Sequence, residues 1–142
     1  MTNIAAASGH LRRATGTAAL LDAAYGAFEE LLSALWERID PGEATFVPLL
    51  MAATFAANGR DAVLFAASLP PRRLPTPPAP GLAPGENGGE GAGDDLAGLS
   101  LLLAARLAEA ADGALDRGDR AACHDAAGYA RQIHDLLTTS SP

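Results

Sequence analysis

Three residue types that can do chemistry stand side by side near the end of the chain, as Cys123, His124 and Asp125. They could form a nucleophile–base pair or a metal site only if their side chains converged. The sequence predicts a helix over 119–138, where consecutive side chains point about 100° apart. His134 shares a face with Cys123 but lies about 16 Å along the axis at 1.5 Å per residue. We therefore expect neither a catalytic nor a metal site here.

The reactivity of Cys123 on its own is a separate question, and the sequence leaves it open. Cys123 stands near the start of a predicted helix, where the helix dipole favours a thiolate. The alternative is a small apolar side chain that fills the core.

Other chemical motifs are absent at the spacing that they require. The residues three before His10, His124 and His134 are Ala7, Ala121 and Arg131, so the Glu-x-x-His pair of di-metal helical bundles is missing. The glycine-rich stretch 85–93 lacks the G-x-x-x-x-G-K pattern of a phosphate loop. We expect no catalytic residue, no metal and no cofactor. This favours a non-enzymatic protein without deciding the question.

The composition favours an all-α protein and argues against two classes of partner. The 142 residues are 49% hydrophobic but only 5% aromatic, with Ala and Leu as the main apolar residues. Both are strong helix formers. The net charge is −7, every basic residue is Arg, and the pI is about 4.7. Because nucleic acids and anionic membranes bind basic surfaces, we expect neither as a partner.

Cysteine usage and the N-terminal region suggest a cytoplasmic location. A single cysteine excludes an intrachain disulfide and fits a reducing compartment. Arg12-Arg13 precedes an apolar stretch, as in an export signal, but Asp22 interrupts that stretch after eight residues. No apolar run reaches the roughly 18 residues of a membrane span. The abundance of Ala, Gly, Pro and Arg suggests a bacterium with a GC-rich genome.

The strongest pattern is a long apolar seam, which predicts one helix over 9–39. Its apolar positions are spaced alternately by three and four residues, as in helices that pack along their length. The central and C-terminal members of this interaction seam are Leu21, Tyr25, Phe28, Leu32, Leu35 and Ile39. Such a helix spans about 46 Å, which is longer than any other predicted helix. Its seam is therefore either an internal core or an interface between copies of the chain.

The remaining segments complete the expected organisation. In the N-terminal part, 1–69, we expect a helix over 46–58 that is apolar almost all round and buried on more than one side. Asn58-Gly59 is interpreted as a helix stop, and a short helix over 61–68 follows it. Residues 70–93 hold seven of the ten prolines and six glycines, which predicts a disordered linker. In the C-terminal part, 94–142, helices over 94–117 and 119–138 form a hairpin. We expect both parts to pack as one antiparallel bundle of four to five helices.

These features favour a non-enzymatic interaction or assembly protein that associates with itself or with another helical protein, with a homo-oligomer as the first expectation. One alternative is a ligand-binding or enzymatic bundle with an apolar cavity around Tyr25, Phe28, Trp36 and Tyr129. Another is an adaptor that uses the proline-rich segment 72–78 as a docking peptide, through Arg72, Pro75 and Pro78.

Overall fold

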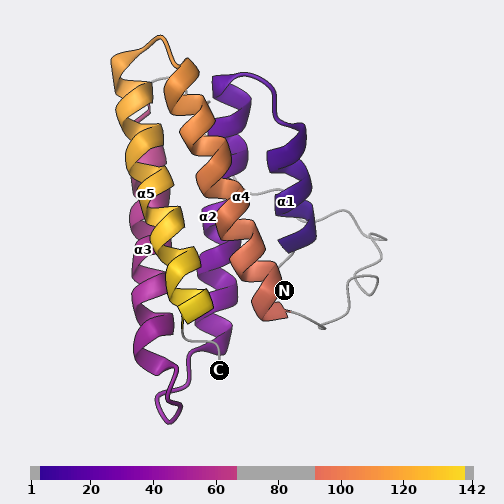
Figure 1. Ribbon diagram of the computed structural model, residues 1–142, viewed down its shortest axis with the longest axis vertical. Coiled ribbons are helices and arrows are strands. Elements are labelled where there is room, and N and C mark those ends of the chain that lie inside the picture. The colour runs from indigo at the N-terminus through magenta and orange to yellow at the C-terminus, as the bar shows by residue number, and fades with distance from the viewer. Residues whose placement is uncertain (1–3, 67–91, 140–142) are drawn as a thin grey trace.

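The computed structural model describes residues 4–66 and 92–139, and side chains from residue 96 onward in the second stretch. These residues form five α-helices and no strand (Figure 1): α1 Ile4–Arg13, α2 Thr17–Arg38, α3 Phe46–Leu64, α4 Ala92–Gly113 and α5 Arg117–Thr139. The all-α class predicted from composition is confirmed. The predicted linker 70–93 lies outside the described residues except for its last two, which belong to α4.

Four helices form the body of the molecule. Around the bundle, α2 contacts α3, α3 contacts α5, α5 contacts α4, and α4 contacts α2. Each helix runs antiparallel to both of its neighbours, and the short α1 lies against α2 and α4 (Figure 1). The chain therefore leaves α3 at one end of the bundle and enters α4 at the other, which is the topology of a bundle with one long crossover.

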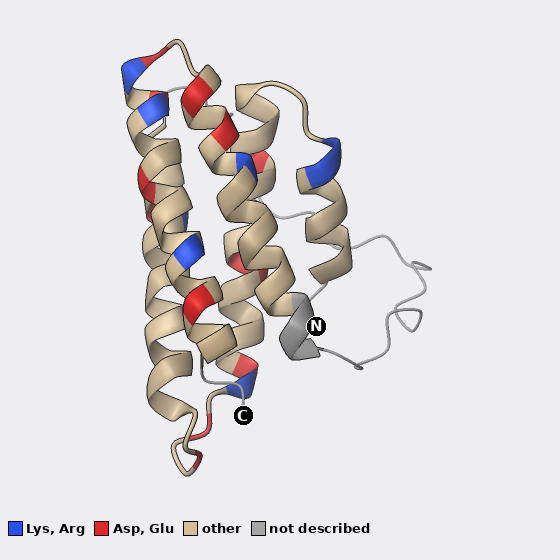
Figure 2. Ribbon diagram, in the orientation of Figure 1, with Lys and Arg blue, Asp and Glu red and all other residues tan. Residues whose placement is uncertain are grey.

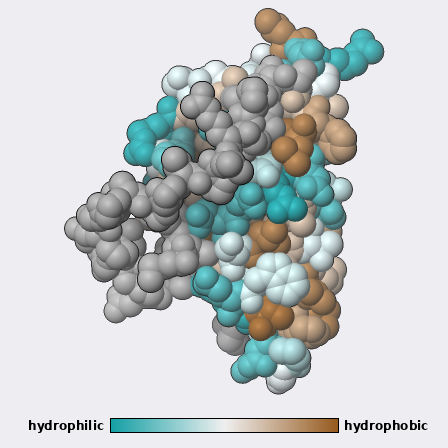
Figure 3. Space-filling view, turned by 180° about the vertical axis from the view of Figure 1, so that it is seen from behind, coloured by the Kyte–Doolittle hydropathy of each residue, from teal (hydrophilic) through white to brown (hydrophobic). Residues whose placement is uncertain are grey.

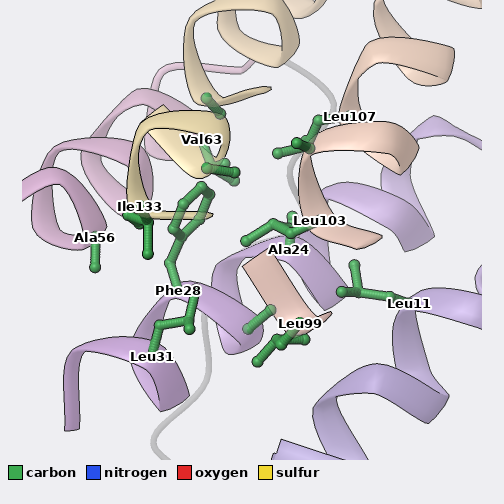
Figure 4. Close-up of a cluster of buried hydrophobic side chains, with 14 of the residues drawn as sticks. Leu11, Ala24, Phe28, Leu31, Ala56, Val63, Leu99, Leu103, Leu107 and Ile133 are labelled. Atoms are coloured by element: carbon green, nitrogen blue, oxygen red, sulfur yellow. The ribbon is translucent and has the colours of Figure 1, made fainter. Parts of the chain in front are cut away.

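The core lies where the four long helices meet, and the ring of Phe28 on α2 is its largest fully buried side chain. In Figure 4 this ring points into the bundle toward Val63 of α3 and Ile133 of α5, with Leu103 and Leu107 of α4 beyond it. Leucines from α2 and α4 supply most of the remaining large buried side chains. Burying each such side chain contributes roughly 1.5–3 kcal/mol, so these leucines are a major source of the stability of the bundle.

The single helix predicted over 9–39 is wrong, because the chain breaks after Arg13. Gly16 adopts a φ of 84°, a left-handed conformation that glycine reaches without a steric penalty. The break lets α1 fold back on the bundle and bury Ala7 and Leu11. What remains as α2 has 22 residues, the same as α4. The first part of the predicted seam therefore packs against the bundle of the same chain. The periodicity of the sequence alone does not indicate that the chain folds back in this way.

The predicted break at Asn58-Gly59 is also absent, since α3 continues to Leu64 as one helix. A Cβ atom at Gly59 would lie 2.3 Å from Cε1 of Phe28. The glycine therefore serves close packing between α2 and α3 and does not end the helix. The prediction of two helices, over 46–58 and 61–68, is corrected to one.

The hairpin turn lies a few residues earlier than predicted. α4 ends at Gly113 and α5 begins at Arg117, in place of the expected bounds 94–117 and 119–138. The carboxylate of Asp116 accepts a hydrogen bond of 2.9 Å from the backbone N–H of Asp119. Asp116 therefore caps α5, and Gly118 lies in the first turn of that helix.

Arg106 of α4 holds α1 in place. Its guanidinium donates hydrogen bonds to the backbone carbonyl oxygens of Leu11, at 3.0 Å, and Ala14, at 2.6 Å. It also forms an ion pair of 3.0 Å with Glu109. The last carbonyls of a helix have no partner within the helix and carry its negative dipole end. Arg106 satisfies them and so closes α1 onto the bundle.

Candidate functional site

The chemical cluster at the start of α5 is divided between the core and the surface. Cys123 is fully buried, whereas His124 and Asp125 are exposed. Burial and, to a smaller extent, the negative charge of Asp119 raise the pKa of the Cys123 thiol from its ordinary 9.0 to about 11. His134 lies at the other end of α5, where its Nδ1 is 3.1 Å from the carbonyl oxygen of Ala97. The geometry gives Cys123 no base within the cluster and keeps it protonated at neutral pH.

We expect the stability of the protein to fall as the pH rises from about 9 toward 11. The unfolded thiol loses its proton near its ordinary pKa of 9.0 while the folded thiol keeps it until about 11. The unfolded state thus binds fewer protons in this window, and unfolding becomes easier. The loss from this group is on the order of 2–3 kcal/mol at most.

Chemical denaturation of the wild type and of Cys123→Ala at pH 8 and pH 11 measures this loss. Tyrosines also ionise in this window, and subtracting the variant removes their contribution. An equal decrease in both proteins would contradict the prediction. So would modification of Cys123 by a thiol reagent at pH 7 at the rate of an unfolded peptide.

The members of the predicted seam fall into two classes. Leu21, Phe28 and Leu35 are fully buried within the single chain. Tyr25, Leu32 and Ile39 are partly buried and pack against the edge of the core. In the isolated chain only the second class has surface left for contact with another molecule.

The four aromatic residues considered for an apolar cavity lie in different environments. Phe28 fills the core against Gly59. Tyr129 stacks on Phe55 with ring centroids 6.1 Å apart. Tyr25 is partly buried and packs against the edge of the core, whereas Trp36 is 56% exposed. The structure therefore does not bring them together around one cavity.

A shallow groove of about 480 Å³ lies elsewhere, between α1 and α2. It is lined by alanines and Gly26, together with the charged residues Arg13, Asp22 and Glu30 and with His10. Asp22 and Glu30 already have interaction partners within the protein. The groove is a place where α1 and α2 fail to pack tightly because small side chains line both helices.

The most distinctive surface is the outward side of α3. Its residues recur at helical spacing, and we call them the outer face of α3: Val47, Leu50, Met51, Thr54, Asn58, Asp61, Leu64 and Phe65. Val47 is 59% exposed and Phe65, in helical conformation just past the end of α3, is 84% exposed. Figure 3 shows hydrophobic atoms at the lower and upper parts of the side where α3 lies. Two sides of this helix are covered by α2 and α5, and its third side is exposed.

Trp36 of α2 adds to this surface. Phe28 beside Gly59 and the ion pair of Glu29 with Arg60 fix the antiparallel register of α2 and α3. Trp36 follows Glu29 by two helical turns on the same side of α2. It therefore lies level with the position two turns before Arg60, beside the exposed N-terminal half of the outer face of α3.

The outer face of α3 carries almost no net charge. Arg60 and Asp61 are the only charged residues of the helix, and their side chains lie 3.5 Å apart. Arg60 also pairs with Glu29 at 3.3 Å. Burial opposes the charged form of Arg60, but these carboxylates outweigh it and raise its pKa. In Figure 2 the lower half of α3 shows no charged residue.

Comparisons with known proteins return nothing that bears on this surface: no family model, no curated protein and no solved structure matches the chain. Within residues 4–66 and 92–139, no group of three His, Cys, Asp or Glu side chains could hold a metal ion. None of the helices in the same stretches has both the length and the apolar character needed to cross a membrane.

The docking peptide predicted at Arg72, Pro75 and Pro78 lies outside the described residues. The outer face of α3 was not identified as a site from the sequence, although the signal was present. A helix that carries leucine, methionine and valine on opposite sides must either be covered completely by other elements or present an apolar surface.

Proposed function

We propose that this chain is a non-enzymatic interaction protein that binds a protein partner through the outer face of α3. The observation that carries the proposal is the exposure of Val47, Met51 and Phe65 on a helix whose inner side already packs into the core. Large exposed apolar residues that gather on one face of a helix in this way are typical of protein–protein contacts.

The residue types support the same interpretation. Trp36 is exposed beside the apolar end of α3, and Trp is enriched among the residues that dominate binding energy. The hydroxyl of Thr54 already donates to the carbonyl oxygen of Leu50 at 3.0 Å. Burial of Thr54 under a partner would therefore leave no unsatisfied donor.

Site-specific photo-cross-linking in the producing cell tests the proposal. A photoreactive residue at Val47 should give a discrete adduct. The same residue at Ala108, which is exposed on α4, should give none and serves as the matched control. No adduct from Val47, or the same adducts from both positions, would contradict the proposal.

A further inference from the structure

We infer that the partner of the outer face of α3 is a second copy of this chain, docked so that the two α3 helices lie antiparallel across a two-fold axis. This inference rests on the proposed function and specifies the partner for the same surface. It follows from the order of residue types along the outer face, from its charge and from its size.

The order of residue types is self-complementary. The exposed apolar residues gather at both ends of the face, with Val47, Leu50 and Met51 at one end and Leu64 and Phe65 at the other. The centre is polar. A two-fold axis brings the first end of one copy against the second end of the other, which is the arrangement of an isologous dimer.

One antiparallel register pairs the outermost apolar residues of the face with each other and the polar residues of its centre with each other. If the axis crosses α3 near Ala56, then Val47 of one copy lies opposite Phe65 of the other, and Met51 lies opposite Asp61. Thr54 then lies opposite Asn58, whose amide can hydrogen-bond the Thr54 hydroxyl. A parallel pair would place Val47 against Val47 at one end and Phe65 against Phe65 at the other.

Electrostatics allow this contact between two copies that each carry a formal charge of −7. The only exposed charge on the outer face is Asp61, and Arg60 lies 3.5 Å from it. In the antiparallel register the two Asp61 residues are ten positions apart along the helix pair, or about 15 Å at 1.5 Å per residue. This exceeds the Debye length of about 10 Å at 0.1 M salt, so their repulsion is weak.

The size of the face predicts a dimer that dissociates on dilution. A helix of 19 residues is about 28 Å long and about 10 Å wide, so one helix offers a footprint of roughly 300 Å². Stable interfaces bury about 800 Å² per partner. Trp36 and its neighbours on α2 enlarge the contact, yet the total remains in the range of transient association.

Cysteine cross-linking tests the register. We expect a mixture of Val47→Cys and Phe65→Cys to form a disulfide-linked heterodimer under mild oxidation, while each variant alone forms much less dimer. In the antiparallel register the Val47 positions of the two copies lie about 27 Å apart along the pair, too far for a disulfide between them. Wild type is the control, since its Cys123 is fully buried. Homodimers from the single variants would show a parallel pair and overturn the inference.

Sedimentation across a hundredfold concentration range tests the partner. Wild type should shift from monomer to dimer, and Met51→Glu, which places a carboxylate opposite Asp61 of the other copy, should weaken the dimer at least tenfold. Leu101→Glu on α4 is matched in exposure, at 47% against 45% for Met51, and should leave the dimer unchanged. Circular dichroism should show both variants as helical as wild type.

A protein that remains monomeric throughout overturns the inference, and the photo-cross-link from Val47 then decides the proposed function. An adduct with another protein keeps the interaction function and shows a different partner. An adduct only within the same chain, for example with residues 67–91, shows that the chain covers its own α3, and both proposals fail.

Discussion

Replacement of Phe28 by aspartate should unfold the whole described bundle. The Phe28 ring is fully buried between α2, α3 and α5, and loss of a buried Phe side chain alone costs about 3–5 kcal/mol. A carboxylate at this position would also lack a partner in the core, which costs several kcal/mol more. The sum is comparable with the roughly 5–15 kcal/mol that stabilises a typical domain. Far-UV circular dichroism should show the loss of most helical signal.

The control for this prediction is a charged residue introduced at a fully exposed position. Leu115, in the turn between α4 and α5, is 100% exposed, so Leu115→Asp should change stability by no more than about 0.5 kcal/mol.

The seam predicted from the sequence could also have been an interface between copies. In that case Phe28→Asp would give a helical monomer. Sedimentation beside circular dichroism separates the two results, and a folded Phe28→Asp monomer would contradict the packing described above.

The helical class and the core face of α2 could be predicted from the sequence because they depend on local pattern. Apolar residues spaced by three and four define the stripe, and Phe28 and Leu35 on that stripe are buried. The break at Gly16 could not be predicted from the glycine alone. Gly9 and Gly26 lie inside α1 and α2 without interrupting them. Whether a glycine ends a helix therefore depends on the packing around it, which is a property of the assembled bundle.

The exposed side of α3 depends even more on the assembled bundle. The sequence shows that the helix is apolar on all sides, but it does not show how many helices are available to cover it. Two neighbours pack against α3, and its third side is left to the surface. A local pattern therefore indicated a buried helix, whereas the tertiary arrangement makes α3 the main candidate for contact with a partner.

Asn58-Gly59 illustrates how one signal can have two origins. Glycine after asparagine commonly ends a helix, but it can also mark a close approach of two helices. The spacing Ala52, Ala56, Gly59 and Val63 continues the buried side of α3 across the glycine. That continuity was visible in the sequence and would have favoured a single helix.

Gly59→Ala should destabilise the protein although alanine favours helices. On helix propensity alone the change would stabilise α3 by about 1 kcal/mol. The added Cβ, however, would lie 2.3 Å from Cε1 and 2.5 Å from Cζ of Phe28, whereas carbon atoms pack at about 3.5–4.0 Å. The ring is fully buried and must displace its neighbours, and overpacking of this kind typically costs about 1–3 kcal/mol. The net effect should be a loss that lowers the midpoint of chemical denaturation.

Two further variants determine whether this loss comes from the contact with Phe28. Gly128→Ala on α5 meets no atom within 4 Å, so it should gain up to about 1 kcal/mol. Adding Phe28→Leu to Gly59→Ala should relieve the clash, so the double variant should be more stable than the sum of the single changes predicts. If Gly59→Ala and Gly128→Ala stabilised the protein equally, Phe28 would not contact Gly59, and the register of α2 against α3 would be incorrect. That register places Trp36 beside the outer face of α3, so the same measurement also tests the geometry of the proposed docking surface.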